Sequence, residues 1–266
     1  MYPILYFAGR PIGTYTLCAI VGILLAGWYA CRAARVRKQD ENEVIILLLV
    51  SVVGILLGSH LLYALTNLGP LLIAWQESAG QGFMLRLEAV APYVGGAVFY
   101  GGLLGGLAAG ALYLRIRRLP FAAYADIAAP AIPLFHAFGR IGCFLGGCCY
   151  GIPWEGGITY TRALTPEANG VARFPVQLLE SALLFALFFL LAALFRRGAL
   201  RGKLLALYLA VYAVLRFLLE FLRGDAIRGV YFGLSTSQWI SLAILLALGV
   251  AALARACARR RARASA

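Results

Sequence analysis

Two arginines in this 266-residue sequence lie inside apolar stretches, where an ionised side chain is costly and usually marks a functional site. Arg140 falls within the stretch 121–149, and Arg216 falls within the stretch 203–222. A guanidinium group stays ionised when desolvated and offers two parallel donors that match phosphate oxygens. The pair predicts a site for a phosphate or a similar anion. Glu220 follows Arg216 by one helical turn, so a purely structural ion pair is the alternative interpretation.

Three of the six cysteines cluster just after Arg140: Cys143, Cys148 and Cys149. They lack a fourth ligand and CxxC-like spacing, so no metal site is predicted. A disulfide between Cys143 and either neighbour, or a nucleophilic thiol, is conceivable. Packing as small apolar residues is the favoured interpretation.

Two glycine-rich runs accompany these residues. The run 101–110 places glycines at spacings that favour close packing of membrane helices. The run 139–151 instead permits a broken helix whose backbone amides could face a ligand. The segment CCYGIP at 148–153 indicates that a helix ends there.

The composition requires a membrane to position these groups. The chain is 62% hydrophobic and 13% charged, with a mean hydropathy of +0.85. We expect an all-α membrane protein with seven transmembrane helices in a single membrane domain. Between spans two and three, prolines and glycines predict an external arm, and the external head at 155–174 is short. The predicted spans are 11–32, 44–66, 94–115, 121–149, 176–196, 203–222 and 234–254.

The basic residues predict the orientation. The net charge is +13, and sixteen of the 24 lysines and arginines fall in the loops that would face the same side as the C-terminus, against six on the other side. The N-terminus is therefore expected outside and the C-terminus in the cytoplasm. Such short basic loops suit a multi-pass protein of the bacterial inner membrane, with anionic lipids as partners, and argue against nucleic-acid binding.

This orientation predicts that polar groups from six spans meet near the outer leaflet. With a rise of about 1.5 Å per residue, Arg216 lies roughly 20 Å above the cytoplasmic end of its span. The other groups expected in this layer are Tyr15, His60, Tyr100, Arg140, Gln177, Glu180 and Glu220. Asp126 alone is expected in the inner half.

Several motifs, in consistent order, resemble the prolipoprotein diacylglyceryl transferase family. Residues 139–147, GRIGCFLGG followed by Gly151, are similar to the family's GRxGNFxNGE…G signature. Residues 99–105 resemble FHGGLxG, residues 175–180 resemble PxQLYE, and residues 212–225 resemble YGxxRFxxEFxRxPD. Tyr15 and the segment 237–239 also match family positions.

The resemblance implies transfer of the diacylglyceryl group of phosphatidylglycerol to a prolipoprotein cysteine at the outer leaflet, with release of glycerol 1-phosphate. It implies no cofactor. The implied catalytic residues are Arg140, Arg216, Tyr100 and Glu220. The implied substrate-binding residues are Tyr15, His60, Gly101, Gly102, Gly142, Cys143, Gly151, Gln177, Glu180 and Arg223. Arg140 and Arg216 would hold the phosphate, while Glu220 and Arg223 orient them.

The sequence departs from the family mainly at positions expected to serve the acceptor. The family histidine before GGL is Tyr100 here, and tyrosine is a poorer base near neutral pH. His60 and His136 are alternative proton acceptors. An asparagine of the signature is Cys143, and its glutamate is Cys148. The main hypothesis is therefore an enzyme with phosphatidylglycerol as donor and a prolipoprotein or another acceptor. A non-catalytic lipid-binding or transport protein is the alternative, and an ion channel or secondary transporter is a distant third.

Overall fold

The computed structural model describes residues 2–96, 98–225 and 230–264, and its chain packs into two compact units. The first unit contains the N-terminal residues up to Ala30 together with residues from Ala125 onward. The second unit comprises Cys31–Tyr124. The boundaries fall inside two helices, α1 (Thr14–Val36) and α6 (Phe121–Gly146), so each of these helices contributes to both units.

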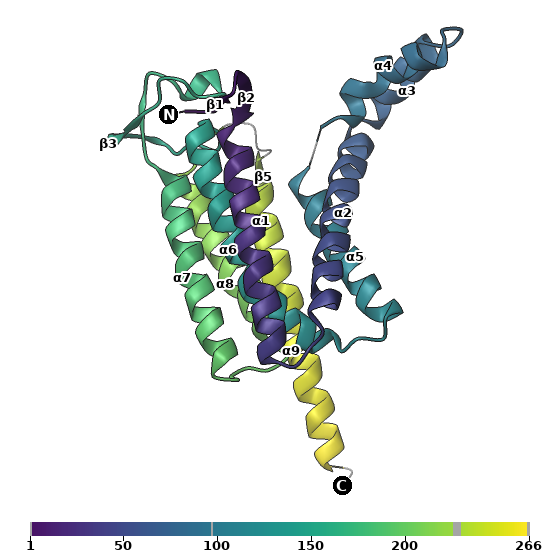
Figure 1. Ribbon diagram of the computed structural model, residues 1–266, viewed down its shortest axis with the longest axis vertical. Helices are drawn as coiled ribbons and strands as arrows, with labels where there is room; N and C mark the ends of the chain where they lie inside the picture. Colours follow the sequence, from purple (N-terminus) through teal and green to yellow (C-terminus); the bar gives the residue numbers. More distant parts are fainter. Residues whose placement is uncertain (1, 97, 226–229, 265–266) are drawn as a thin grey trace. The chain divides into compact units, whose positions relative to one another are not determined.

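Long apolar helices build the first unit. Besides most of α1 and α6, it contains α7 (Val176–Arg196), α8 (Leu204–Leu219) with a 3-10 turn, η2 (Glu220–Leu222), and α9 (Thr236–Ala264). Edge-to-face aromatic contacts join some of these helices. Phe138 of α6 packs against Phe185 of α7, and Tyr29 of α1 packs against Phe188 of α7. These contacts hold α1 and α6 beside α7, and a further ring contact, between His136 of α6 and Tyr212 of α8, brings α8 against α6 (Figure 1).

A small cap of irregular chain covers one end of these helices. It includes the antiparallel pairs β1 (Ile4–Phe7) with β2 (Arg10–Gly13) and β3 (Pro153–Thr159) with β4 (Ala172–Arg173), and the 3-10 turn η1 (Pro166–Ala168). A third short pair, β5 (Val230–Tyr231) with β6 (Leu234–Ser235), precedes α9. Figure 1 shows β1, β2 and β3 at the same end of the helices. The predicted short head is present, but sequence patterns did not foresee these two-stranded ribbons.

The buried side chain of Arg173 holds the cap together. Its guanidinium donates to the carbonyl oxygens of Glu167 (2.7 Å), Ala168 (3.3 Å) and Gly151 (3.4 Å), and lies over the ring of Tyr150. Three backbone acceptors compensate for the desolvation of this cation.

The second unit is a pair of helices, α2 (Glu41–Thr66) and α5 (Phe99–Ile116), with a helical hairpin between them. Glycines let the two backbones touch: a Cβ added at Gly58 would lie 2.2 Å from the carbonyl oxygen of Gly101, and one at Gly105 would lie 2.2 Å from that of Gly54. The predicted close packing by the glycines of α5 is confirmed.

The predicted external arm is the hairpin of α3 (Leu68–Glu77) and α4 (Phe83–Val94). Its prolines do not prevent helix formation, because Pro70 lies in the first turn of α3, where backbone N–H groups have no helical acceptor. Pro92 lies within the last turn of α4, so little helix remains for it to disrupt.

Within the part of the chain that the structure describes, six helices are long and apolar enough to cross a membrane: Thr14–Val36, Glu41–Thr66, Phe121–Gly146, Val176–Arg196, Leu204–Leu222 and Thr236–Ala258. The mostly helical chain is thus a multi-pass membrane protein. The remaining predicted span corresponds to α5, whose apolar part, Gly101–Ile116, is shorter. Asp126 is buried, and its carboxylate accepts hydrogen bonds from the backbone amides of Gly202 and Leu204 at the start of α8.

Candidate functional site

Glu180 of α7 is the centre of a buried polar cluster in the first unit. Its side chain is 2% exposed, and its Oε2 lies 3.1 Å from Arg140 Nε of α6. The hydroxyl of Tyr212, from α8, donates to Glu180 Oε1 at 3.2 Å. His136 Nε2, one turn before Arg140, lies 3.9 Å from the same oxygen. Three helices therefore converge on one carboxylate.

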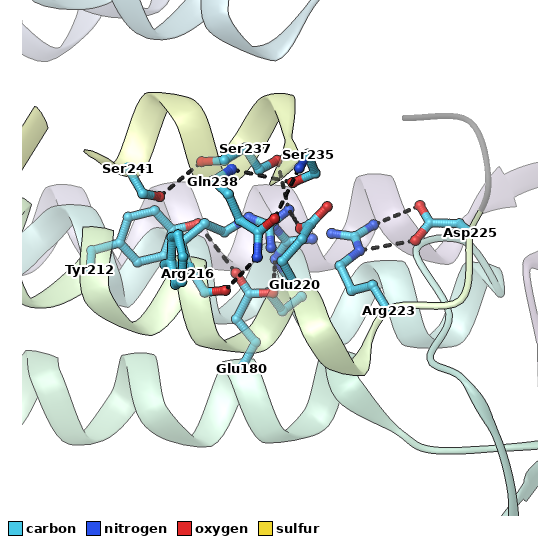
Figure 2. A network of polar contacts seen from close by, with 12 residues as sticks. Glu180, Tyr212, Arg216, Glu220, Arg223, Asp225, Ser235, Ser237, Gln238 and Ser241 are labelled. Carbon is cyan, nitrogen blue, oxygen red and sulfur yellow. Dashed lines mark hydrogen bonds and ion pairs between the residues drawn. The ribbon is translucent and has the colours of Figure 1, made fainter. Parts of the chain in front are cut away.

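Arg216 begins a second set of contacts, between α8 and α9. Its Nη2 forms an ion pair with Glu220 Oε2 at 2.5 Å and donates to Ser237 Oγ at 3.0 Å. Ser241 donates to the carbonyl oxygen of Ser237 one turn along α9. Figure 2 shows Arg216 between Glu220 and the serines of α9, with Glu180 and Tyr212 nearby.

Arg223 extends the cluster toward the cap. It forms a bidentate ion pair with Asp225, in which the Nε–Oδ1 distance is 3.0 Å and the Nη2–Oδ2 distance is 2.8 Å (Figure 2). Burial raises the pKa of Asp225 although Arg223 opposes that shift. The backbone of Arg223 also pairs with Gly151, which connects the end of η2 to the cap.

Two guanidinium nitrogens in this cluster have no hydrogen-bond acceptor among the described residues. They are Nε of Arg140, whose approach to Glu180 is an ion pair without hydrogen-bond geometry, and Nη1 of Arg216. Both atoms are buried. Because unpaired buried donors are rare and costly, such atoms call for an explanation, and an anionic ligand would supply the missing acceptors.

Tyr15 of α1 lies against the same part of α6. A Cβ at Gly142 would lie 3.0 Å from Tyr15 Cδ2 and 3.2 Å from the Cβ of Cys18, so the two helices meet closely at this glycine. Tyr15 is also within electrostatic range of Arg140 and Cys143. The tyrosine therefore borders the polar cluster.

Comparison with known proteins places this architecture in a family. The family model of prolipoprotein diacylglyceryl transferases matches residues 3–255. This chain belongs to the prolipoprotein diacylglyceryl transferase family. The predicted membership and the predicted transferase class are both confirmed.

Three relatives that match this chain over about two thirds or more of its length are named as transferases of this kind. The phosphatidylglycerol–prolipoprotein diacylglyceryl transferase of Clostridium tetani is 31% identical, covering 91% of this chain and 93% of its own. The protein of the same name from Geobacter sulfurreducens is 36% identical over 69% of this chain and 66% of its own. Transferase 2 of Clostridium perfringens is 31% identical over 90% and 89%.

Two predicted family positions have mainly structural contacts in this chain. Gln177 donates to the carbonyl oxygen of Cys148 at 2.8 Å and accepts from Tyr160, so it fastens the chain after α6 to the start of α7. A Cβ at Gly151 would lie 2.2 Å from the carbonyl oxygen of Phe174, which makes glycine necessary for the cap itself.

Four further predicted family positions belong to the second unit. His60 Nδ1 faces the carbonyl oxygens of Gly96 (2.8 Å) and Val94 (3.2 Å). Since carbonyl oxygens only accept hydrogen bonds, Nδ1 of His60 carries a hydrogen. Gly101 and Gly102 pack against α2. Tyr100 begins α5, but its side chain lies outside the described part of the structure.

Sequence reasoning did not assign roles to three members of the cluster: Tyr212, Ser237 and Asp225. All three fall within stretches that resemble family motifs, 212–225 and 237–239, so the motifs supplied the signal. What the motifs did not show is that Tyr212 shares Glu180 with Arg140, which depends on the packing of α6, α7 and α8 against one another.

Proposed function

We propose that this protein transfers the diacylglyceryl group of phosphatidylglycerol to the cysteine thiol of a prolipoprotein and releases glycerol 1-phosphate at the outer leaflet. The names of its relatives support the donor, the acceptor and the reaction type. The buried unpaired nitrogens of Arg140 and Arg216 carry the proposal for the site, because they are donors that a phosphodiester can satisfy.

The chemistry explains why two guanidinium groups are useful. The acceptor sulfur attacks the glyceryl carbon that bears the phosphate, the C–O bond breaks, and the thiol proton leaves to a base. The phosphodiester carries one negative charge, whereas the departing phosphomonoester gains a second. Arg140 and Arg216 would therefore stabilise the charge that grows in the transition state. Glu180, Glu220 and Arg223 act as positioning residues in this scheme.

The base has several candidates. Tyr100 takes the position of the family histidine, and His60 lies in the same unit, with its Nδ1 held by backbone carbonyl oxygens. Replacing Tyr100 by Phe tests the first candidate, since unchanged activity would remove its hydroxyl from the reaction. His60→Asn tests the second while keeping a side chain that can donate to the carbonyl oxygens of Gly96 and Val94.

We also propose seven spans, with α5 as the third, an external N-terminus and a cytoplasmic C-terminus in the bacterial inner membrane. The asymmetry of the basic loops supports this topology. It puts the C-terminal ends of α6 and α8, where the cluster lies, at the external side. Labelling of single cysteines in intact cells tests it: position 197, in the loop between α7 and α8, must be protected from impermeant reagents.

Purified protein in vesicles that contain phosphatidylglycerol labelled in its glycerol headgroup tests the reaction. With a lipobox peptide, the wild-type protein should release labelled glycerol phosphate and lipidate the peptide. Arg140→Ala and Arg216→Ala should each reduce the rate by at least about 100-fold, as expected for a lost transition-state donor. The exposed Arg197→Ala is the matched control and should retain the wild-type rate.

Two results would contradict the proposal. Full transfer by either arginine variant would exclude its role at the phosphate. Tight binding of phosphatidylglycerol by the wild-type protein without release of glycerol phosphate, with any lipobox peptide, would indicate the lipid-binding or transport protein instead.

A further inference from the structure

Three thiols gather where α6 ends, immediately beside the arginine cluster. The Sγ atoms of Cys143, Cys148 and Cys149 all lie within 4.8 Å of one another. Cys143 is buried in the last turn of α6, and the other two are partly buried in the turn that follows. The family resemblance implies a substrate-binding position at Cys143, but the transfer proposed above gives none of the three thiols a chemical step.

A tight reversal of the backbone brings the sulfurs together. The amides of Gly147 and Cys148 donate to the carbonyl oxygens of Phe144 and Cys143, at 3.2 and 3.1 Å, which closes the end of the helix. Gly147 and Cys149 both have left-handed backbone conformations, with φ of +74° and +56°. Such a conformation is uncommon for a residue with a Cβ, so the surrounding structure must hold Cys149 there.

Neighbouring elements fix this turn from three sides. Gln177 of α7 binds the carbonyl oxygen of Cys148, and the amide of Gly224 donates to the carbonyl oxygen of Tyr150 at 3.0 Å. Gly147 is pressed against Ala163 of the cap, where an added Cβ would lie 2.3 Å from that residue's Cβ. The thiols therefore sit on a preorganised support, which a metal site requires.

Positive charge lies close to these sulfurs, because Arg140 and Arg223 are both within electrostatic range of Cys149. A thiolate, not a thiol, is the form that binds metal. The same arginines would offset the negative charge that three thiolates bring to a divalent ion.

We propose that Cys143, Cys148 and Cys149 together bind one Zn²⁺ ion and leave its fourth coordination position open. A tetrahedral site with Zn–S bonds of about 2.3 Å places its sulfurs about 3.8 Å apart, which small side-chain rotations can reach from this arrangement. Among the described residues, no histidine, aspartate or glutamate joins this group of three cysteines as a fourth ligand. Three protein ligands with an open position are typical of catalytic rather than structural zinc.

The open position identifies the class of ligand, and this step rests on the proposed function. A prolipoprotein thiol that binds there loses its proton to solvent as the Zn–S bond forms, because coordination to the metal deprotonates a thiol. The resulting thiolate lies beside Arg140 and can attack the glyceryl carbon, while the C–O bond to phosphate breaks. The metal would thereby supply the acceptor activation that Tyr100 provides poorly.

Metal binding can be measured without any activity. Full-length protein, reduced and stripped of metal, is titrated with Zn²⁺ against a chromophoric chelator, and with Co²⁺ to observe the thiolate charge-transfer band. We expect one ion per chain and a band intensity typical of three Co–S bonds. Cys143→Ser, Cys148→Ser and Cys149→Ser should each weaken binding at least about 100-fold, more than the loss of an outer-shell partner. Cys18→Ser and Cys257→Ser are the controls and should bind normally.

Three results would contradict the zinc site. Binding of less than one tenth of an ion per chain, or equal affinity in the Cys149→Ser variant, would overturn the metal site. A disulfide between Cys143 and either neighbour that persists in protein purified under mild reduction would do the same. Thermal melting of the serine variants, which should match the wild type in the absence of metal, excludes misfolding as the cause of weak binding.

A second assay separates the metal site from the proposed function. Transfer to the lipobox peptide is compared for metal-free protein, protein reloaded with Zn²⁺, and Cys149→Ser. We expect transfer only in the reloaded wild type, with a thiol pKa of the peptide lowered in its pH–rate profile. Equal rates in all three would overturn the zinc role and leave the transferase assignment intact. Stoichiometric zinc without any transfer would support the site and contradict the proposed function.

Discussion

The two units use different means to bring helices together. In the second unit, α2 and α5 touch through glycines, and the backbone of each helix occupies the space where a side chain of the other would lie. In the first unit, α6, α7 and α8 share one buried carboxylate, that of Glu180, with partners on either side. The first arrangement needs small residues at fixed spacing. The second needs charges that neutralise one another.

This difference separates structural support from chemistry. A contact between glycines is made by backbone atoms alone, so it leaves no side-chain donor that could bind a ligand. The ion pairs of the first unit leave Arg140 Nε and Arg216 Nη1 without acceptors, so the helices are joined and donors remain for an anion. Substitutions in the two units should accordingly affect stability and turnover in different proportions.

The largest effect is expected from Glu180→Ala, which leaves Arg140 buried without its counter-ion. Loss of one partner of a buried pair costs about 3–5 kcal/mol, so a lower melting temperature and no measurable transfer are expected. The double variant Arg140→Met, Glu180→Leu should recover most of the stability and none of the transfer. If this double variant regained transfer, the pair would have only a structural role.

Gly58→Ala should destabilise the second unit by about 3 kcal/mol, since its Cβ would collide with the backbone of α5 and cannot be relieved by a rotamer change. Below its lowered melting temperature, the folded fraction should bind phosphatidylglycerol with normal affinity. Gly27→Ala is the matched control, because a Cβ there meets no atom within 4 Å. Weak lipid binding by folded Gly58→Ala protein would show that the glycine contact also serves the ligand.

Asp126→Ala removes two hydrogen bonds to backbone amides at the start of α8 and should cost about 2 kcal/mol. Thermal unfolding in detergent measures this loss. The rate of transfer per folded molecule should stay at the wild-type value, because Asp126 is bonded to Gly202 and Leu204 rather than to the polar cluster. A lower rate would place this carboxylate among the groups that act on substrate.

Tyr212→Phe should give the smallest effect, about 1 kcal/mol of stability, because it deletes one hydrogen bond and keeps the ring. The ring contacts with His136 and Tyr208 remain. Glu180 then relies more on Arg140, so a decrease in kcat by about five-fold is expected with KM unchanged. A change in KM alone would instead indicate that the hydroxyl contacts the lipid.

Local signals in the sequence were sufficient to locate the long helices. The predicted spans 11–32, 44–66 and 176–196 agree with α1, α2 and α7 within a few residues, because a membrane constrains both the length and the composition of a helix that crosses it. The helicity of the arm was missed, since Gly80, Gly82 and Pro92 signal interruption without saying that helices form on either side. The β ribbons of the cap were missed for a similar reason, because β4 has only two residues.

The candidate site was only partly predictable. The motifs singled out Arg140, Glu180 and Arg216, but the partner of each depends on how the helices pack. The cysteines illustrate this limit: the sequence predicted a helix end at 148–153, but it did not predict the left-handed backbone of Cys149, which accompanies the approach of its sulfur to that of Cys143. The spacing of cysteines along the sequence, on which the search for a metal site relied, does not reveal a reversal of the backbone of this kind.

Arg140 and Arg216 differ in how far along the sequence their counter-ions lie, and this difference affects how their helices enter the membrane. Arg216 and Glu220 belong to the same segment, so that segment can enter the bilayer already as an internally neutral unit. Arg140 enters with α6, while Glu180 is made about 40 residues later with α7, and an arginine without its counter-ion makes the insertion of a helix less favourable. We therefore expect α6 to enter the lipid most readily together with α7, as a pair whose charges neutralise each other.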